Sequence, residues 1–161
     1  MATTADPQRI ANSALGQELE HGECQILANA MQVVHLSDRE YATREKGSAN
    51  TLFLLIEGKL AVSNEVNAGE DKTVYIMSPG ECAGTRAFVD RTPRKASLQA
   101  VGSAVVYTLE PNTFEKLLDS HPKLVYKVMR ALFRITHTNL MRMNQESQQL
   151  AAYINSPGRR A

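Results

Sequence analysis

The spacing of hydrophobic positions changes twice along this chain and divides it into a helical start, a β-rich middle and a helical end. Between residues 8 and 30, apolar side chains recur every three or four positions. Gly16 and the pair His21 and Gly22 interrupt this pattern. The spacing therefore predicts two short helices with a break between them.

The middle of the chain, residues 31–110, consists of short apolar runs separated by turn-forming residues. The runs are MQVVHL, TLFLLIE, KLAVSN, TVYIM, ASLQAV and AVVYTL. Many short strands at this spacing are typical of a small antiparallel roll or barrel. Glu57 and Gly58, between the second and third runs, are interpreted as a tight hairpin.

The last third of the chain returns to helical spacing. Pro111 opens a predicted short helix, PNTFEKLLDS, with proline in its first turn. A second helix is predicted from Pro122 to about Tyr153, and its length of about 31 residues corresponds to roughly 46 Å. Its apolar stripe comprises Val125, Val128, Leu132, Ile135, Leu140, Met143 and Leu150. Because a roll of this size covers only part of such a helix, we expect an identical helix of a second chain to cover the remainder.

Composition limits the classes of function. The 161 residues suit one domain with an appended helix, and the net charge of +1 provides no basic field for nucleic acid. Cys24 and Cys82 lie far apart, which indicates reduced thiols. No apolar run approaches the roughly 18 residues of a membrane span, and the N-terminus lacks the pattern of a secretion signal. We therefore expect a cytoplasmic protein that does not bind membranes.

The segment GTRAFVDRTPRKAS, Gly84 to Ser97, carries the strongest chemical signal. A glycine precedes a short predicted helix, and Arg94 follows Pro93. Free backbone N–H groups at a helix start, facing a guanidinium, can bind a phosphate group. Glycine allows the backbone to approach the anion closely.

This segment resembles the phosphate-binding cassette of cyclic nucleotide-binding domains, whose pattern is roughly G-E-L-A-x(5)-P-R-A-A-T. The matching or nearly matching residues are Gly84, Ala87, Pro93, Arg94, Ala96 and Ser97. Upstream, GSANTLFLLIEGKLAV, which begins at Gly47, resembles the family pattern G-x-x-x-x-L-Y-I-I-x-x-G-x-V. The resemblance covers roughly residues 20–153. It implies a mainly β fold with flanking helices, a double-stranded β-helix (jelly roll), followed by a long C-terminal α-helix.

The resemblance also implies which residues bind a ligand. The cassette candidates are Gly84, Thr85, Arg86, Ala87, Arg94, Lys95, Ala96 and Ser97. Thr138 and Asn139 correspond to positions where the long helix covers the base, and Asn139 could instead fix the register of a helix pair. Arg86 is either solvent-exposed or a second cation of the site, and Ser97 either donates to a phosphate oxygen or is a strand hydroxyl.

One departure from the family pattern concerns Thr85, which stands where the family has a glutamate that accepts a hydrogen bond from the ribose 2′-hydroxyl. A threonine hydroxyl is shorter and uncharged. Losing a hydrogen bond to a charged group costs about 1.5–3 kcal/mol, which corresponds to roughly ten- to hundredfold in affinity. Thr85 is either the N-cap of the cassette helix or a weaker ribose contact.

The expected organisation has four segments: a flexible N-terminus (1–9), the roll with its short helices (10–121), a long dimerisation helix (122–154) and a flexible tail (155–161). Regulators that resemble this domain often continue into a winged helix of about 60 residues. Because INSPGRRA leaves no room for one, direct DNA binding is not expected, and Arg159 and Arg160 are interpreted as a solvated tail.

Two functions stay open at this stage, and a third is less supported. The first is a regulatory module that senses cyclic AMP, cyclic GMP or a similar phosphate-bearing molecule and signals through the long helix to an unknown effector protein. The second is a ligand-free dimeric scaffold. The third, a metal-dependent barrel enzyme, lacks clustered ligands, since the four histidines are scattered. We therefore expect no enzyme activity and no firm cofactor.

Overall fold

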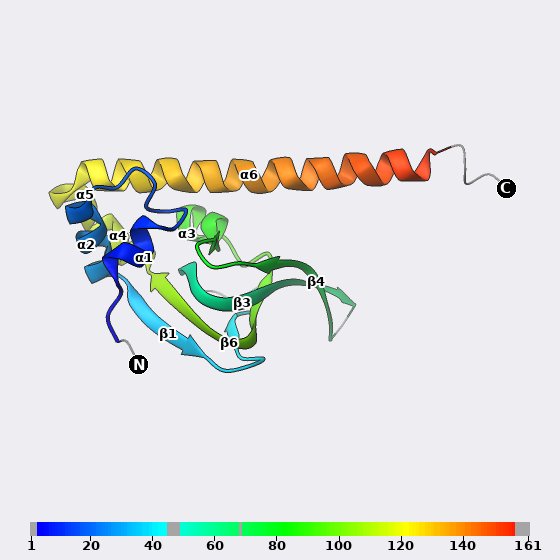
Figure 1. Ribbon diagram of the computed structural model, residues 1–161, viewed down its shortest axis with the longest axis horizontal. Helices are drawn as coiled ribbons and strands as arrows, with labels where there is room; N and C mark the ends of the chain where they lie inside the picture. Colours follow the sequence, from blue (N-terminus) through cyan, green and yellow to red (C-terminus); the bar gives the residue numbers. More distant parts are fainter. Residues whose placement is uncertain (1–2, 45–48, 68, 157–161) are drawn as a thin grey trace.

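The computed structural model describes residues 3–44, 49–67 and 69–156, so Gly47, Arg159 and Arg160 lie outside the described residues. A coiled antiparallel sheet lies beside one long helix, and most of the short helices gather at the end where that helix begins (Figure 1). The mainly β roll with flanking helices and a long C-terminal helix, expected from the sequence, is confirmed.

The helices begin at residues suited to helix starts. Their bounds are α1 Pro7–Ala11, α2 His21–Ala30, α3 Thr85–Asp90, α4 Pro111–Glu115, α5 Leu117–Ser120 and α6 Pro122–Ile154. Proline occupies the first turn of α1, α4 and α6, and the Asp6 carboxylate accepts the Gln8 N–H at 2.9 Å. His21 and Gly22 do not interrupt a helix, because α2 begins at His21; Glu20 and Glu23 form a capping box there.

Six strands form the sheet. Their bounds are β1 Gln32–Leu36, β2 Tyr41–Thr43, β3 Leu52–Asn67, β4 Glu70–Met77, β5 Cys82–Ala83 and β6 Ser97–Leu109. The order is β1-β6-β3-β4, with β2 paired to β6 and β5 paired to β3, and the pairs are antiparallel. The sequence did not predict β2 and β5, because two or three residues are too few to display an alternating pattern.

The hairpin predicted at Glu57 and Gly58 is wrong. These residues lie inside the continuous strand β3, which pairs with β6 on both sides of them through an irregular register. Gly58 has a φ of 86°, and a Cβ there would collide with the carbonyl oxygen of Ser103. A bulge of this kind bends a strand without ending its pairing, so two apolar runs form one strand.

The apolar run in β3 is continuous because both faces of this strand are buried. Side chains at alternate positions point to opposite faces. Phe53 and Leu55 pack inside the roll, whereas Leu52, Leu54 and Ile56 pack against the helices. The helix-side cluster also takes in the first turns of α6 through Leu124, Val125, Val128 and Leu132. The roll and the start of α6 are therefore joined by one core.

Candidate functional site

The predicted cassette forms a turn and a short helix between β5 and β6. Gly84 precedes α3 with a φ of 84°, in the left-handed region that favours glycine. A Cβ at Gly84 would lie 2.5 Å from Nη1 of Arg94 and 2.9 Å from the carbonyl oxygen of Thr51. Only glycine therefore allows the arginine to lie directly against this turn.

Arg94 is a buried cation with incomplete hydrogen bonding. Its side chain is 4% exposed, and its Nη2 donates to the carbonyl oxygen of Thr51 at 2.6 Å. Its guanidinium carbon lies 5.1 Å from the centroid of the Phe53 ring. Within the described residues, Nε and Nη1 have no hydrogen-bond acceptor. Because buried N–H groups are rarely left unpaired, these nitrogens are available to an acceptor that the described residues do not supply.

The charge of Arg94 is balanced only in part by the protein. Burial lowers the pKa of Arg94, and the carboxylate of Glu110 opposes this shift. Glu110 is itself engaged, since it accepts a hydrogen bond from Thr51 Oγ1 at 2.6 Å. An anion next to Arg94 would accept hydrogen bonds from the two unpaired nitrogens, Nε and Nη1, and compensate the buried charge.

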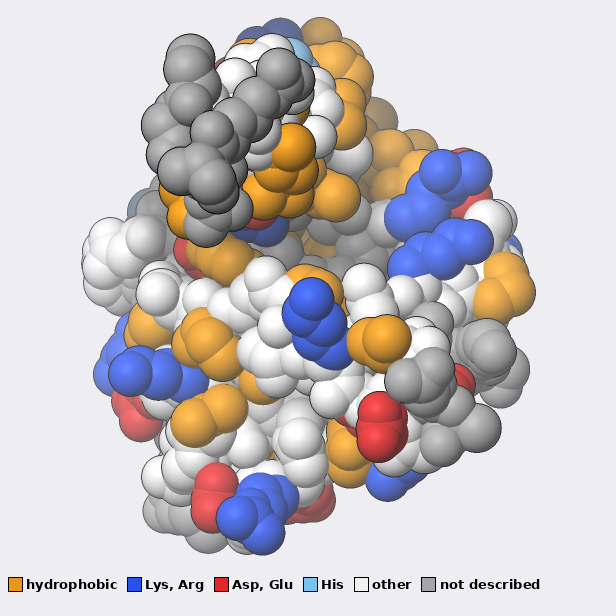
Figure 2. Space-filling model, turned by 90° about the vertical axis from the view of Figure 1, so that its right-hand side faces the viewer, with side chains coloured by type: hydrophobic (Ala, Val, Ile, Leu, Met, Phe, Trp, Pro, Cys, Tyr) orange, Lys and Arg blue, Asp and Glu red, His pale blue; other side chains and the backbone are white. Residues whose placement is uncertain are grey.

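A cavity of about 910 Å³ lies between the roll and α6. Figure 2, which faces the end of the molecule where α6 ends, shows the helix above the roll and the cleft between them. Of the predicted site residues, Gly84, Thr85, Thr138 and Asn139 line this cavity together. The structure thus brings the start of α3 and the middle of α6, about 50 residues apart in sequence, to one space.

The other predicted site residues do not line the cavity. Arg94 lies behind Gly84, and Ala87 and Ser97 are buried. Ala96 is half-buried, and Lys95 is exposed.

Arg86 is also exposed. Its Nε pairs with the carboxylate of Asp90 on the same helix at 2.5 Å. Of the two interpretations of Arg86, the structure therefore supports solvent exposure and not a second cation at the cavity.

Thr85 does not cap α3. The N-cap is Gly84, and no side chain forms a cap hydrogen bond at this helix. Thr85 is instead the first helical residue, and its Oγ1 lies 3.5 Å from Oγ1 of Thr136 on α6. The cap interpretation of Thr85 is wrong, because the left-handed glycine already forms the turn that leads into the helix.

Sequence analysis missed several polar residues of the cavity wall, chiefly Arg134, Arg142, Tyr75 and Glu81. Arg134 and Arg142 lie four residues before and after Thr138, so helical spacing alone would have placed them on the same face. Nη1 of Arg134 donates to Glu18 at 3.1 Å, whereas its Nη2 is buried without an acceptor in the described part of the chain.

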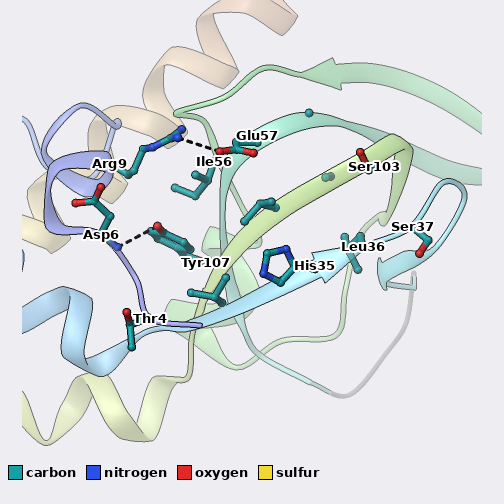
Figure 3. A pocket seen from close by; sticks show the side chains of 14 residues that line it. Thr4, Asp6, Arg9, His35, Leu36, Ser37, Ile56, Glu57, Ser103 and Tyr107 are labelled. Atoms are coloured by element: carbon teal, nitrogen blue, oxygen red, sulfur yellow. Dashed lines mark hydrogen bonds and ion pairs between the residues drawn. The ribbon is translucent and has the colours of Figure 1, made fainter. Parts of the chain in front are cut away.

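A second cavity, of about 770 Å³, lies between the N-terminal segment and the strands β1, β3 and β6 (Figure 3). Two pairs of its polar groups already interact: Arg9 with Glu57 at 2.9 Å, and the backbone N–H of Asp6 with the Tyr107 hydroxyl at 3.0 Å. It contains none of the predicted site residues. In residues 3–44, 49–67 and 69–156, no group of three or more His, Cys, Asp or Glu side chains could hold a metal ion.

Comparison with known proteins identifies the relatives of the chain. The family model of the cyclic nucleotide-binding domain matches residues 33–121. A cAMP-dependent protein kinase regulatory subunit of Dictyostelium discoideum is 27% identical over 94 residues, which are 56% of this chain and 29% of that protein. A CRP-like cAMP-activated global transcriptional regulator of Mycobacterium tuberculosis is 21% identical over 150 residues, 93% of this chain and 65% of that protein. The chain thus spans less than two thirds of the length of either relative.

Solved structures agree with the fold. A cyclic nucleotide-binding domain from Methylobacillus flagellatus superposes with a TM-score of 0.81 at 18% identity, covering 89% of this chain and 84% of that one. Among the helices of the described residues, none is long and apolar enough to cross a membrane.

Proposed function

The chain belongs to the cyclic nucleotide-binding domain family, and we propose that it is a regulatory module that binds a cyclic nucleotide or a similar phosphate-bearing molecule in the cavity beneath α6. The observation that carries this proposal is the buried guanidinium of Arg94, which lies against Gly84 with two of its nitrogens, Nε and Nη1, unpaired. In this proposal the chain acts by binding and not by catalysis. Two buried, unpaired thiols, Cys24 and Cys82, support a cytoplasmic location.

The proposed binding mode uses both walls of the cavity. Arg94 and the backbone N–H groups next to Gly84 and Thr85 hold the phosphate, while Thr138 and Asn139 cover the base. Thr85 lacks the carboxylate that would accept a ribose hydroxyl, so we expect affinity in the micromolar range or weaker. Binding shifts the position of α6 only if the ligand has a higher affinity for the protein with the helix in one position than in the other. The signal then passes from α6 to a partner protein.

Calorimetric titration with cyclic AMP and cyclic GMP tests the proposal. We expect micromolar binding that Arg94→Ala abolishes. Arg86→Ala is the matched control, because Arg86 belongs to the same segment but pairs with Asp90 in solvent. Circular dichroism establishes that each variant is folded, and Arg94→Lys, which keeps a buried cation, replaces Arg94→Ala if the latter unfolds. Absence of heat at millimolar nucleotide with folded wild-type protein would reject a cyclic-nucleotide sensor.

We also propose that the chain forms a homodimer through α6. Exposed apolar residues follow the alternating three- and four-residue spacing of a coiled coil; they are Tyr126, Met129, Phe133, Leu140, Met143, Leu150 and Ile154. Phe133 is 74% exposed, which is unusual for a phenylalanine. Sedimentation should give a dimer for the wild type and a monomer for Phe133→Glu. Met141→Glu, next to Leu140 but off this stripe, should remain dimeric.

A second candidate is a ligand-free scaffold, and two observations favour it. Arg86 pairs with its own helix, and Arg94 already donates one hydrogen bond to Thr51. A scaffold would give no heat in the titration while still forming the dimer. The open cavity and the unpaired N–H groups of Arg94 are the reasons for preferring the sensor.

A further inference from the structure

An arginine of α6 lies over an aromatic ring of the roll, within the cavity beneath α6. The guanidinium carbon of Arg142 is 3.8 Å from the centroid of the Tyr75 ring. Tyr75 belongs to β4, and both residues line the cavity. At this distance the planar guanidinium covers the face of the ring and makes a cation–π contact.

The Tyr75 ring is held from its far end. Its hydroxyl donates to Oε1 of Glu81 at 2.7 Å, and Oε2 of Glu81 accepts the backbone N–H of Ser78 at 3.3 Å. The Glu81 hydrogen bond and partial burial raise the pKa of Tyr75, so the hydroxyl stays protonated and continues to donate. The ring is therefore a fixed flat surface, whereas Arg142 is a long side chain whose other neighbour, the carboxylate of Glu146, is 4.0 Å away.

The residues around this surface suit a purine ring. Val62, the cross-strand partner of Tyr75, and Met77 lie beside it on the cavity wall. Thr138 lies one helical turn before Arg142 on the same face of α6, a separation of about 6 Å along the helix axis. A base stacked on Tyr75 would therefore lie about one helical turn from Thr138. Nucleobases stack on aromatic side chains much as a guanidinium does, because each presents a flat π-face.

We propose that Tyr75 is the stacking surface for the base of the ligand, and that Arg142 occupies this surface until a purine displaces it. This inference rests on the proposed function, since it names the base-binding residue of the same cavity. Displacement of Arg142 breaks a contact between the roll and the outer half of α6, residues 136–154. Base recognition and release of that half are thus one event.

Titrations of the wild type and four variants with cyclic AMP test the inference. Tyr75→Ala should weaken binding by about 5- to 100-fold, the range for loss of one base–aromatic stack. Tyr75→Phe, which keeps the ring and loses only the hydrogen bond to Glu81, should bind within about threefold of the wild type. Arg142→Ala should tighten binding by about two- to fivefold, because the competing cation is gone. In a Tyr75→Ala background, Arg142→Ala should have no effect.

The NMR signal of the Arg142 Nε–H provides a second readout. In the ligand-free protein, the ring should shift this signal upfield, and saturating cyclic AMP should return it to the position found in Tyr75→Ala. A role of Tyr75 in folding alone would not produce this response.

The outcomes separate this inference from the proposed function. If Arg94→Ala abolishes binding while Tyr75→Ala leaves it unchanged, the stacking inference is wrong and the sensor stands. If Arg142→Ala binds cyclic AMP and the wild type does not, the inference is supported and the native chain is not a sensor. If neither the wild type nor Arg142→Ala binds at millimolar nucleotide, both proposals are wrong.

Discussion

The two halves of α6 are attached to the molecule in different ways. From Pro122 to Ile135, the helix buries Leu124, Val128 and Leu132 completely or nearly so. From residue 136 to Ile154, its large apolar side chains remain more than half exposed; they are Leu140, Met141, Met143, Leu150, Tyr153 and Ile154. A shared core fixes the inner half, whereas contacts between individual side chains, such as Thr136 with Thr85 and Arg142 with Tyr75, link the outer half to the roll.

This difference assigns separate tasks to one continuous helix. The cavity is lined by Ala131 and Ile135 of the inner half and by Thr138, Asn139 and Arg142 of the outer half. A ligand in the cavity would therefore touch both halves, but only the outer half could move without breaking the core. Regions held by few buried contacts open at low free-energy cost, and the outer half is such a region.

The largest effect is expected when one leucine in each half of α6 is truncated to alanine. Leu132→Ala removes a side chain that is 2% exposed and should lower the free energy of unfolding by about 2–5 kcal/mol. Leu150→Ala, at 59% exposure, should change it by less than about 0.5 kcal/mol. Urea unfolding followed by circular dichroism measures both, at a concentration low enough to keep the protein monomeric. Equal losses would contradict the division of α6 into an anchored and a loose half.

A smaller effect is expected at Thr85, which contacts the first turn of the outer half. Thr85→Glu introduces a carboxylate for the ribose 2′-hydroxyl and should strengthen cyclic AMP binding by about 1.5–3 kcal/mol, or roughly ten- to hundredfold. Calorimetry with 2′-deoxy cyclic AMP is the control, because that ligand has no hydroxyl to donate and should gain nothing. An equal gain for both ligands would show that the new carboxylate acts elsewhere.

The smallest expected effect concerns the ion pairs of the inner half. Oε2 of Glu18 accepts from Nη1 of Arg134 at 3.1 Å and from Nε of Arg130 at 3.2 Å. The hydrogen bond from Arg134 and the two positive charges outweigh desolvation and hold the pKa of Glu18 below its usual range. Because the pKa of Glu18 is lower in the folded protein than in the unfolded chain, where it is about 4.3, the ionised carboxylate stabilises the fold at pH values above that. This stabilisation is lost as the pH falls from about 4.3 through the pKa of the folded protein.

Melting temperatures of the wild type and Glu18→Gln between pH 7 and pH 3 measure this contribution. The wild type should melt slightly higher at pH 7, and the difference should vanish towards pH 3 as Glu18 is protonated. A difference that persists at pH 3 would mean that Glu18 acts through packing and not through its charge. Glu115→Gln serves as a control outside this group of ion pairs, since Glu115 pairs with Arg91.

The spacing of apolar residues predicted those parts of the fold in which the spacing repeats regularly. The strands of the roll and the long helix follow from alternating and three-to-four spacing, and Gly84 with Arg94 followed from a motif. The bend at Gly58 was not predictable, because glycine is favoured both in a hairpin turn and in a bulge. The two differ only in whether a neighbouring strand, here β6, pairs with the chain on both sides of the glycine.

Side-chain partners were less predictable than elements. Arg86 and Asp90 are four residues apart on one helix, so their pairing follows from local spacing, whereas the inward position of Arg94 depends on where α3 ends relative to β6. Tyr75 and Arg142 are 67 positions apart, and their contact exists only because α6 crosses β4. Their residue types gave no signal, since a lone tyrosine and a lone arginine are common on any surface.

The length of α6 beyond its anchored half has a mechanical consequence. From Ile135 to Ile154 the helix extends about 28 Å at ~1.5 Å per residue. A rotation of about 10° at the anchored end, produced by a side-chain rearrangement in the cavity, would move the free end by about 5 Å over this length. In this way the helix would act as a lever arm, and a side-chain rearrangement in the cavity would become a displacement as large as a side chain at the end of the helix.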